Sequence, residues 1–76
     1  MKDRLYKTAS QVFGITSELL NEESSPDTIE QWDSLGHMNL IMALEEEFGI
    51  LFSEDEVAKI TNMGSILTAF KNKKIP

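Results

Sequence analysis

Cysteine is absent from this chain of 76 residues, and no long apolar run occurs anywhere in it. Without cysteine the chain forms no disulfides, and we therefore expect a cytosolic (cytoplasmic) protein. No stretch approaches the roughly 20 apolar residues that a membrane-spanning helix needs. The first residues, Met-Lys-Asp-Arg-Leu-Tyr, also lack the apolar segment of a signal peptide. These absences predict a protein that does not interact with membranes.

Basic residues are missing from the whole middle of the chain. Residues 8–58 contain no Lys or Arg, whereas every acidic residue except Asp3 lies in that stretch, and the net charge is −6. A field of one sign repels nucleic acid and anionic lipid and attracts basic protein surfaces. The distribution excludes nucleic-acid binding and fits either docking to basic partner proteins or a merely soluble acidic domain.

Length and composition indicate one small domain. A chain of 76 residues allows a single domain over residues 1–76, which we expect to be a monomer. A domain of this size buries only about 60% of its unfolded surface, so there is no deep interior for a large active site. Hydrophobic residues make up 41% of the sequence, which is enough for a folded globule.

Helical periodicity and stop signals divide the chain into helices. The pattern predicts helices over residues 3–13, 34–48, 53–60 and 62–72. Gly14 and Gly49 are natural left-handed stops, and Ser53-x-x-Glu56 is a capping box. Alternating strand patterns are absent, and residues 15–33 form a long connection. The predicted fold class is all-α: a small four-helix bundle with one short helix and a long loop between helices 1 and 2.

Apolar positions in the predicted helices indicate the core. The side chains expected to face inward are Leu5, Ala9, Val12, Phe13, Leu40, Ile41, Leu44, Phe48, Met63, Ile66, Leu67 and Phe70. The long connection needs anchors against this core, for which we expect Ile15, Leu19, Leu20, Ile29 and Trp32. Lys71, Lys73 and Lys74 should complement the negative end of the last helix.

Ser34 stands where the second predicted helix begins. Either Asp33 or Ser34 would cap this helix, and the serine hydroxyl would lie at the surface. A phosphate ester placed there would meet unsatisfied backbone N–H groups and the positive end of the helix dipole. The alternative is that the serine is only an N-cap and does nothing else.

The second helix carries a second apolar group outside its core stripe. Leu35, Met38 and Met42 occupy a separate sector of the helical wheel, next to Glu45 and Glu46. A helix packed by neighbours on several sides would explain this group. A partly exposed docking strip would also explain it, because flexible Met side chains adapt to several partners. We favour docking, since a helix packed all round should not carry Glu in that sector.

Catalysis and metal binding are not expected. Asp33, Ser34 and His37 lie within one helical turn, so they cannot align as acid, nucleophile and base. His37 should pack beside the core or form local hydrogen bonds. The acidic residues at 45–47 point in different directions, and residues 53–56 lack the spacing of a calcium loop. The chain is therefore predicted to be neither an enzyme nor a metal-binding protein.

Several segments together resemble the acyl carrier protein family and its peptidyl- and aminoacyl-carrier relatives. They are the Asp33-Ser34-Leu35 triplet, the helix over 40–48, the acidic turn at 53–56 and the segment 60–70. The resemblance implies the four-helix fold of acyl carriers, with 4′-phosphopantetheine covalently attached to Ser34 between Asp33 and Leu35. The thiol of that cofactor would hold intermediates as thioesters for a biosynthetic pathway of the fatty-acid or polyketide kind.

The same resemblance implies protein partners. These are a phosphopantetheinyl transferase and the enzymes that activate and transfer acyl or aminoacyl groups, which would bring basic docking surfaces. On this chain we expect those surfaces to meet Met38, Met42, Glu45 and Glu46.

The chain departs from typical fatty-acid carriers at two positions. They carry acidic residues where this sequence has Gly36 and Asn39. Together with Trp32 and His37, these changes resemble stand-alone carriers of dedicated pathways and argue against a housekeeping role in fatty-acid synthesis. An acyl cargo is favoured over an aminoacyl or hydroxyacyl one. The alternatives are a stand-alone aminoacyl or peptidyl carrier, and an unmodified acidic helical interaction domain.

Overall fold

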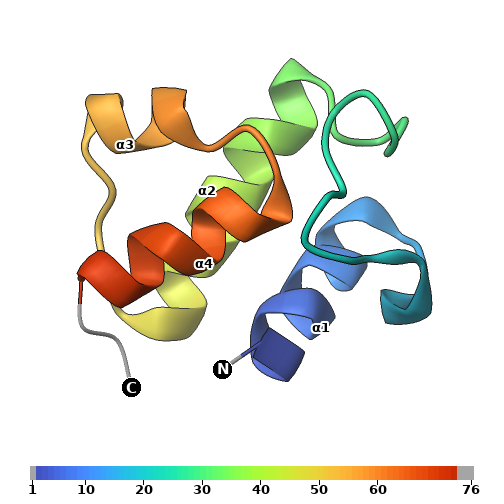
Figure 1. Cartoon of the computed structure of the whole chain (residues 1–76), viewed down its shortest axis with the longest axis horizontal. Coiled ribbons are helices and arrows are strands. Elements are labelled where there is room, and N and C mark those ends of the chain that lie inside the picture. The colour runs from blue at the N-terminus through green and yellow to red at the C-terminus, as the bar shows by residue number, and fades with distance from the viewer. Residues whose placement is uncertain (1, 74–76) are drawn as a thin grey trace.

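The computed structural model describes residues 2–73, and this part of the chain contains helices and no strand (Figure 1). The helices are α1 (Lys2–Phe13), α2 (Ser34–Phe48), α3 (Glu54–Lys59) and α4 (Met63–Asn72). A short 3-10 turn, η1 (Ser17–Leu19), interrupts the long connection between α1 and α2. The predicted class and helix order are confirmed, whereas η1 was not predicted.

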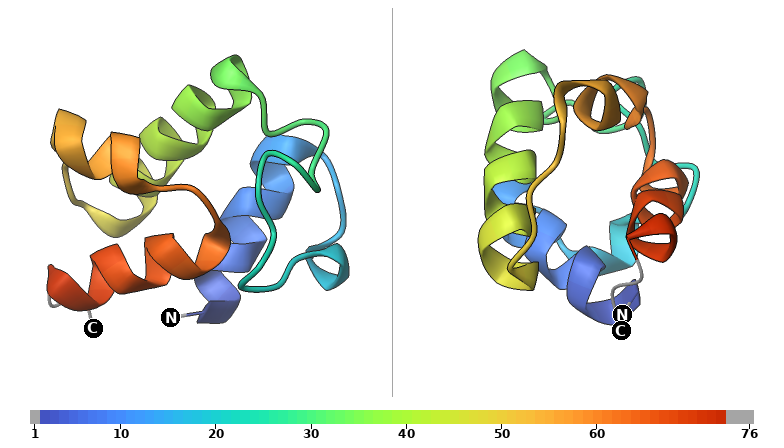
Figure 2. Two further views of the ribbon diagram at one scale, coloured as in Figure 1. Left: turned by 45° about the horizontal axis from the view of Figure 1, so that its top comes forward. Right: turned by 90° about the vertical axis from the view of Figure 1, so that its left-hand side faces the viewer.

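The helices surround one hydrophobic core. Helix α1 packs along α2, and the right-hand view of Figure 2 shows α2 and α4 on opposite sides, with α3 across one end and α1 near the other. The largest fully buried side chains are Trp32, Phe70, Leu5, Leu40, Leu44, Met63 and Ile66. Every helix except the short α3 contributes to this list, so α3 rests on the core without supplying a buried residue of its own.

Local capping signals explain where the helices begin and end. Gly14 and Gly49 both adopt a left-handed backbone, with φ of 68° and 65°, as expected for helix stops. Ser53 and Glu56 form the predicted capping box at the start of α3. Asn62 and Ser65 form a second one at the start of α4. Each of these four helix boundaries therefore has a cause in one or two neighbouring residues.

Most of the predicted core side chains are buried. Val12, Phe48 and Leu67 are only half-buried, but they still pack against the core. Of the predicted loop anchors, Leu20, Ile29 and Trp32 are buried and Ile15 is half-buried.

Leu19 is exposed, so its prediction as an anchor was wrong. It ends η1, where the N–H groups of Leu19 and Leu20 donate to the carbonyls of Thr16 and Ser17. This tight turn points successive side chains in different directions, and only Leu20 reaches the core.

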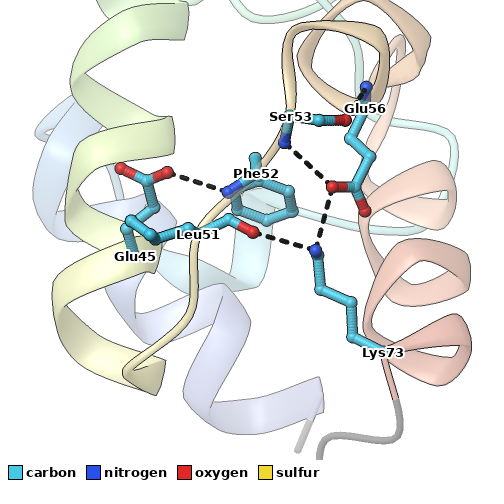
Figure 3. A network of polar contacts seen from close by, with 6 residues as sticks. All are labelled: Glu45, Leu51, Phe52, Ser53, Glu56 and Lys73. Atoms are coloured by element: carbon cyan, nitrogen blue, oxygen red, sulfur yellow. Dashed lines mark hydrogen bonds and ion pairs between the residues drawn. The ribbon is translucent and has the colours of Figure 1, made fainter.

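A polar network holds the segment between α2 and α3 in place (Figure 3). Lys73 Nζ lies 2.9 Å from both the Leu51 carbonyl oxygen and Glu56 Oε1. Glu56 Oε1 also accepts the Ser53 N–H at 2.9 Å. This N–H first, and then the Lys73 ammonium, lower the pKa of Glu56 below its usual value. Polar contacts of this kind compensate for the sparse apolar packing of α3.

The lysines at the end of α4 have different surroundings from those expected. Lys71 lies in the last turn of α4, as predicted. Lys73 instead directs its ammonium across to Leu51 and Glu56, because these acceptors lie within reach of its long side chain. Lys74 lies outside the described residues.

Candidate functional site

The first turn of α2 presents the Ser34 hydroxyl at the surface. Asp33 is the N-cap: its Oδ1 accepts the Gly36 N–H at 2.8 Å, and its carbonyl oxygen accepts the His37 N–H at 2.7 Å. Ser34 is therefore the first residue of the helix, and it is exposed. Among residues 2–73 no partner contacts its hydroxyl, and none accepts the N–H groups of Ser34 and Leu35. The capping role thus belongs to Asp33, which leaves the serine hydroxyl accessible for chemistry.

Gly36 lets the preceding loop lie directly against this first turn. A Cβ atom built on Gly36 would overlap the backbone carbonyl oxygen of Gln31 and would lie 3.2 Å from Asp33 Oδ1. The backbone angles of Gly36 are ordinary for a helix, so space and not conformation requires glycine here. A longer side chain at this position would push the loop away from Ser34.

His37 joins three parts of the chain. Its Nδ1 accepts the indole N–H of Trp32 at 2.9 Å, and its Nε2 lies 3.2 Å from the carbonyl oxygen of Val57 in α3. Because Nδ1 is an acceptor, the proton belongs on Nε2, which donates to Val57. The indole and imidazole rings are stacked, with centroids 6.2 Å apart. This geometry assigns the neutral imidazole to a structural link.

A catalytic triad is incompatible with these contacts. Both His37 nitrogens are engaged by Trp32 and Val57, and the Asp33 carboxylate caps the helix. The predicted local hydrogen bonding of His37 is confirmed. The bond to Val57 was not predicted, because it joins residues 20 positions apart and no local pattern signals it.

A groove of about 860 Å³ opens beside Ser34. It lies between the segment 25–32, the first two turns of α2, and α3 with the residues that follow it. Trp32, His37, Met38 and Val57 are among its lining side chains. The acidic lining residues are Asp27, Glu30 and Asp33, and the lining includes no Lys or Arg.

An exposed apolar strip runs along α2 from the same end. Leu35, Met38 and Met42 are 71%, 48% and 55% exposed, so α2 is not packed on all sides. Glu46 is exposed beside this strip. Leu51, which was not predicted to be part of a surface, is 80% exposed in the α2–α3 segment. The exposure of the strip leaves it accessible to a partner protein.

Glu45 differs from Glu46 in its surroundings. Its side chain is half-buried, and Oε2 accepts the backbone N–H of Phe52 at 2.9 Å (Figure 3). Both glutamates were expected to lie beside the exposed sector of α2 and outside its core stripe. The contact of Glu45 with Phe52 was not predicted, because it depends on how the chain folds back at Gly49 and brings Phe52 within reach of the carboxylate.

No group of three or more His, Asp or Glu side chains between residues 2 and 73 is arranged to hold a metal ion. Within the same residues, no helix is long and apolar enough to cross a membrane.

Comparison with known proteins gives consistent results. The chain is 32% identical over 74 residues to an acyl carrier protein of Nitratidesulfovibrio vulgaris, covering 97% of each chain. It is 34% identical over 68 residues to an acyl carrier protein of Helicobacter acinonychis, covering 80% of this chain and 87% of the relative. No protein-family model matches the chain.

A solved structure has the same fold. It is the solution NMR structure of a holo acyl carrier protein from Geobacter metallireducens, with a TM-score of 0.86 and 38% sequence identity. The similarity covers 96% of this chain and 84% of that one.

Proposed function

The chain belongs to the acyl carrier protein family, and we propose that Ser34 is the residue that carries its cofactor. Proteins of this family are carriers and not enzymes. They use a covalently bound 4′-phosphopantetheine, whose thiol holds acyl groups as thioesters for other enzymes. The function of this protein is therefore to carry acyl intermediates within a biosynthetic pathway.

The surroundings of Ser34 suit this attachment. The hydroxyl is exposed and without a partner in residues 2–73, because Asp33 already caps α2. The N–H groups of Ser34 and Leu35, in the first turn of α2, have no acceptor among residues 2–73. These donors and the helix dipole stabilise a negative group there by roughly 0.3–1 kcal/mol. The exposed Ser34 hydroxyl at the start of α2 is the observation that carries this proposal.

The attachment step uses coenzyme A and a phosphopantetheinyl transferase. Ser34 Oγ forms a bond to the phosphorus that bears pantetheine, and the P–O bond to the adenosine bisphosphate part of coenzyme A breaks. The hydroxyl proton passes to a base of the transferase, and adenosine 3′,5′-bisphosphate leaves. Asp33 holds the helix start in place during this reaction, since its carboxylate bonds the Gly36 N–H and its carbonyl bonds the His37 N–H.

Family membership implies a phosphopantetheinyl transferase and acyl-handling enzymes as partners. The docking surface that we infer on this chain consists of Leu35, Met38 and Met42, with Glu46 as its exposed charge. Partner surfaces should be basic and partly apolar. Glu45 acts in this surface mainly by fixing the α2–α3 segment through Phe52. We further propose one domain over residues 1–76 that acts as a monomer in the cytoplasm.

Mass spectrometry after incubation with a phosphopantetheinyl transferase and coenzyme A tests the attachment. The wild type should gain the mass of one phosphopantetheine, and Ser34→Ala should gain none. Ser17→Ala, an exposed serine in η1, is the matched control and should be modified like the wild type.

A thiol assay adds an independent measurement. The chain has no cysteine, so a titratable thiol should appear only after modification. A mass gain that persists in Ser34→Ala would contradict the proposal. Absence of any mass gain in the wild type would favour the unmodified interaction domain.

A further inference from the structure

We propose that His37 is a positioning residue for the loading of Ser34, and that a proton gained by its ring ends this positioning. In its neutral form His37 holds Trp32 and α3 in fixed places around the start of α2. In its charged form it releases Trp32. This inference rests on the attachment at Ser34 proposed above, and it concerns the conditions under which that attachment is fast.

Trp32 anchors the segment that leads into the cap of α2. Its side chain is only 1% exposed, and its ring centroid lies 5.5 Å from that of Phe13 in α1. Its indole N–H donates to His37 Nδ1 at 2.9 Å. Solvent has little access to a side chain this buried, so the N–H depends on His37 as its acceptor. The residue that directly precedes the helix cap is therefore held in place through His37.

The other ring nitrogen of His37 holds α3. Nε2 lies 3.2 Å from the carbonyl oxygen of Val57, which is 20 positions further along the chain. No residue of α3 is buried, so this bond supplements a weak apolar attachment of the helix. Trp32 and Val57 line the same groove as Ser34. A transferase that reaches the serine hydroxyl therefore meets a loop and a helix whose places both depend on one imidazole.

The imidazole gains a proton only by giving up its bond to Trp32. Nε2 already carries the proton that it donates to Val57, so an added proton goes to Nδ1. Nδ1 would then present an N–H to the indole N–H, and two donors that face each other repel. The charged ring must turn away, or the indole must leave its place. Histidine is the side chain that ordinarily changes charge between about pH 5 and pH 8.

The charges near His37 favour its released form. Asp27, Glu30 and Asp33 line the same groove, and the lining includes no Lys or Arg. Helices α1, α3 and α4 contribute no charged side chain to it, and α2 contributes none besides His37. An imidazolium that turns away from Trp32 therefore meets carboxylates, which stabilise its charge. The neutral and the charged ring thus have different partners, and only the neutral ring holds the indole.

Nitrogen NMR of the unmodified wild type tests the contact without any variant. At about pH 8 the ring of His37 should carry its proton on Nε2 and leave Nδ1 bare. When the pH is lowered to about 5.5, the indole N–H signal of Trp32 should move in step with protonation of the ring. The chain has one histidine and one tryptophan, so both signals are unambiguous. The indole signal of His37→Gln should stay constant over the same range.

Loading rates with coenzyme A and a phosphopantetheinyl transferase test the positioning. His37→Gln supplies an acceptor and a donor in one uncharged amide, whereas His37→Phe retains a ring that has neither. At about pH 8, kcat/KM should be nearly that of the wild type for His37→Gln and about tenfold lower for His37→Phe. The loss should lie in KM and not in kcat, because fewer molecules present the positioned surface to the transferase.

The pH dependence of loading separates the switch from a merely structural role. Between about pH 8 and 5.5, kcat/KM of the wild type should fall about fivefold relative to that of His37→Gln. Dividing the two values at each pH removes the pH dependence of the transferase itself. Asn39→Ala, at an exposed position of the same helix, is the matched control and should keep the wild-type pH dependence. Far-UV circular dichroism establishes that each variant is folded at both pH values.

Three results would overturn the inference. The first is an indole signal that stays constant while the ring of His37 gains its proton. The second is a ratio of wild-type to His37→Gln loading that does not change with pH. The third is an equal KM for His37→Gln and His37→Phe; if His37→Phe does not fold, the first two results still decide. A wild type that gains no phosphopantetheine mass at about pH 8 would instead show that the attachment at Ser34 fails.

Discussion

At the scale of single residues, Gly36 and His37 shape the surroundings of Ser34. Gly36 allows the Gln31 carbonyl to lie against the first turn of α2. His37 fixes the Trp32 ring on one side and Val57 on the other. A side chain at position 36, such as that of an acidic residue, would not be accommodated by this packing. The glycine and the tryptophan are thus two parts of one local arrangement.

The first prediction is that Gly36→Ala destabilises the protein. Alanine at a helical position normally gains up to about 1 kcal/mol over glycine. Here its Cβ overlaps the Gln31 carbonyl oxygen, a backbone atom that moves only if the loop moves. We expect a net loss of about 1–3 kcal/mol in the free energy of unfolding, measured by urea denaturation with far-UV circular dichroism.

Asn39→Ala is the matched control for this substitution. Asn39 is exposed in the same helix, so alanine there should change stability by no more than about 0.5 kcal/mol. Gly36→Ala with stability equal to or above that of the wild type would show that the loop does not press on α2 in solution.

At the scale of elements, the last turn of α2 runs against a general rule. It carries Glu45, Glu46 and Glu47 and no basic residue, although negative charge is unfavourable at a helix C-terminus. Arg4 of α1 compensates in part, since its Nη2 donates to the Glu47 carbonyl at 2.6 Å and its Nε lies 3.1 Å from the Glu47 carboxylate. Violations of local rules concentrate at functional sites. The exposed charge of Glu46 fits such a role.

The second prediction separates Glu45 from Glu46. Glu46→Lys should slow phosphopantetheine transfer at low salt and matter less at high salt, because charge steering mainly affects association rates. Its stability should equal or exceed that of the wild type. Glu45→Lys should in addition lose about 1–3 kcal/mol, since the half-buried Phe52 N–H is left without its acceptor.

Stopped-flow transfer assays at two salt concentrations, with urea denaturation of each variant, provide the measurements. Glu45→Gln keeps an acceptor oxygen for the Phe52 N–H and should lose less stability than Glu45→Lys. If Glu46→Lys leaves the transfer rate unchanged at low salt, the docking surface lies elsewhere on the molecule.

The sequence was sufficient to predict those structural features that depend on residues close together in the chain. The helix stops at Gly14 and Gly49 and the capping box at Ser53 depend on residues within one turn, and all were predicted. The exposed sector of α2 could also be read from its periodicity and its glutamates. Leu19 was misplaced because apolar character alone does not distinguish it from its neighbour Leu20.

Contacts between distant segments could not be predicted from the sequence. The bonds from His37 to Val57, from Glu45 to Phe52 and from Lys73 to Leu51 depend on how the chain turns between helices. The groove beside Ser34 has the same origin, because its walls come from three separate segments. Patterns in a single sequence predict the faces and the ends of helices. The contacts between distant segments can be located only once the packing of the helices is known.

At the scale of the whole molecule, charge acts on all parts at once. The described chain measures 28 × 23 × 20 Å, and the net charge is −6. At 0.01 M salt the screening length is about 30 Å, so each acidic residue interacts with nearly every other one. At 0.1 M it is about 10 Å, and only neighbours interact. Self-repulsion should therefore destabilise the fold most at low salt.

The third prediction is that sodium chloride stabilises the protein between 0.01 M and 0.5 M. Salt also weakens the ion pairs of Lys2 with Glu22 and of Arg4 with Glu47, but both are largely exposed and exposed pairs stabilise little. Relief of repulsion should outweigh this loss and raise the free energy of unfolding by about 1 kcal/mol. The increase would be visible as a higher urea midpoint. The double variant Glu18→Gln/Glu46→Gln reduces the magnitude of the net charge, from −6 to −4. It should therefore show a weaker dependence of stability on salt. A urea midpoint that falls with salt would mean that the ion pairs contribute more to stability than the repulsion takes away. Repulsion among the acidic residues would then have little effect on the free energy of unfolding.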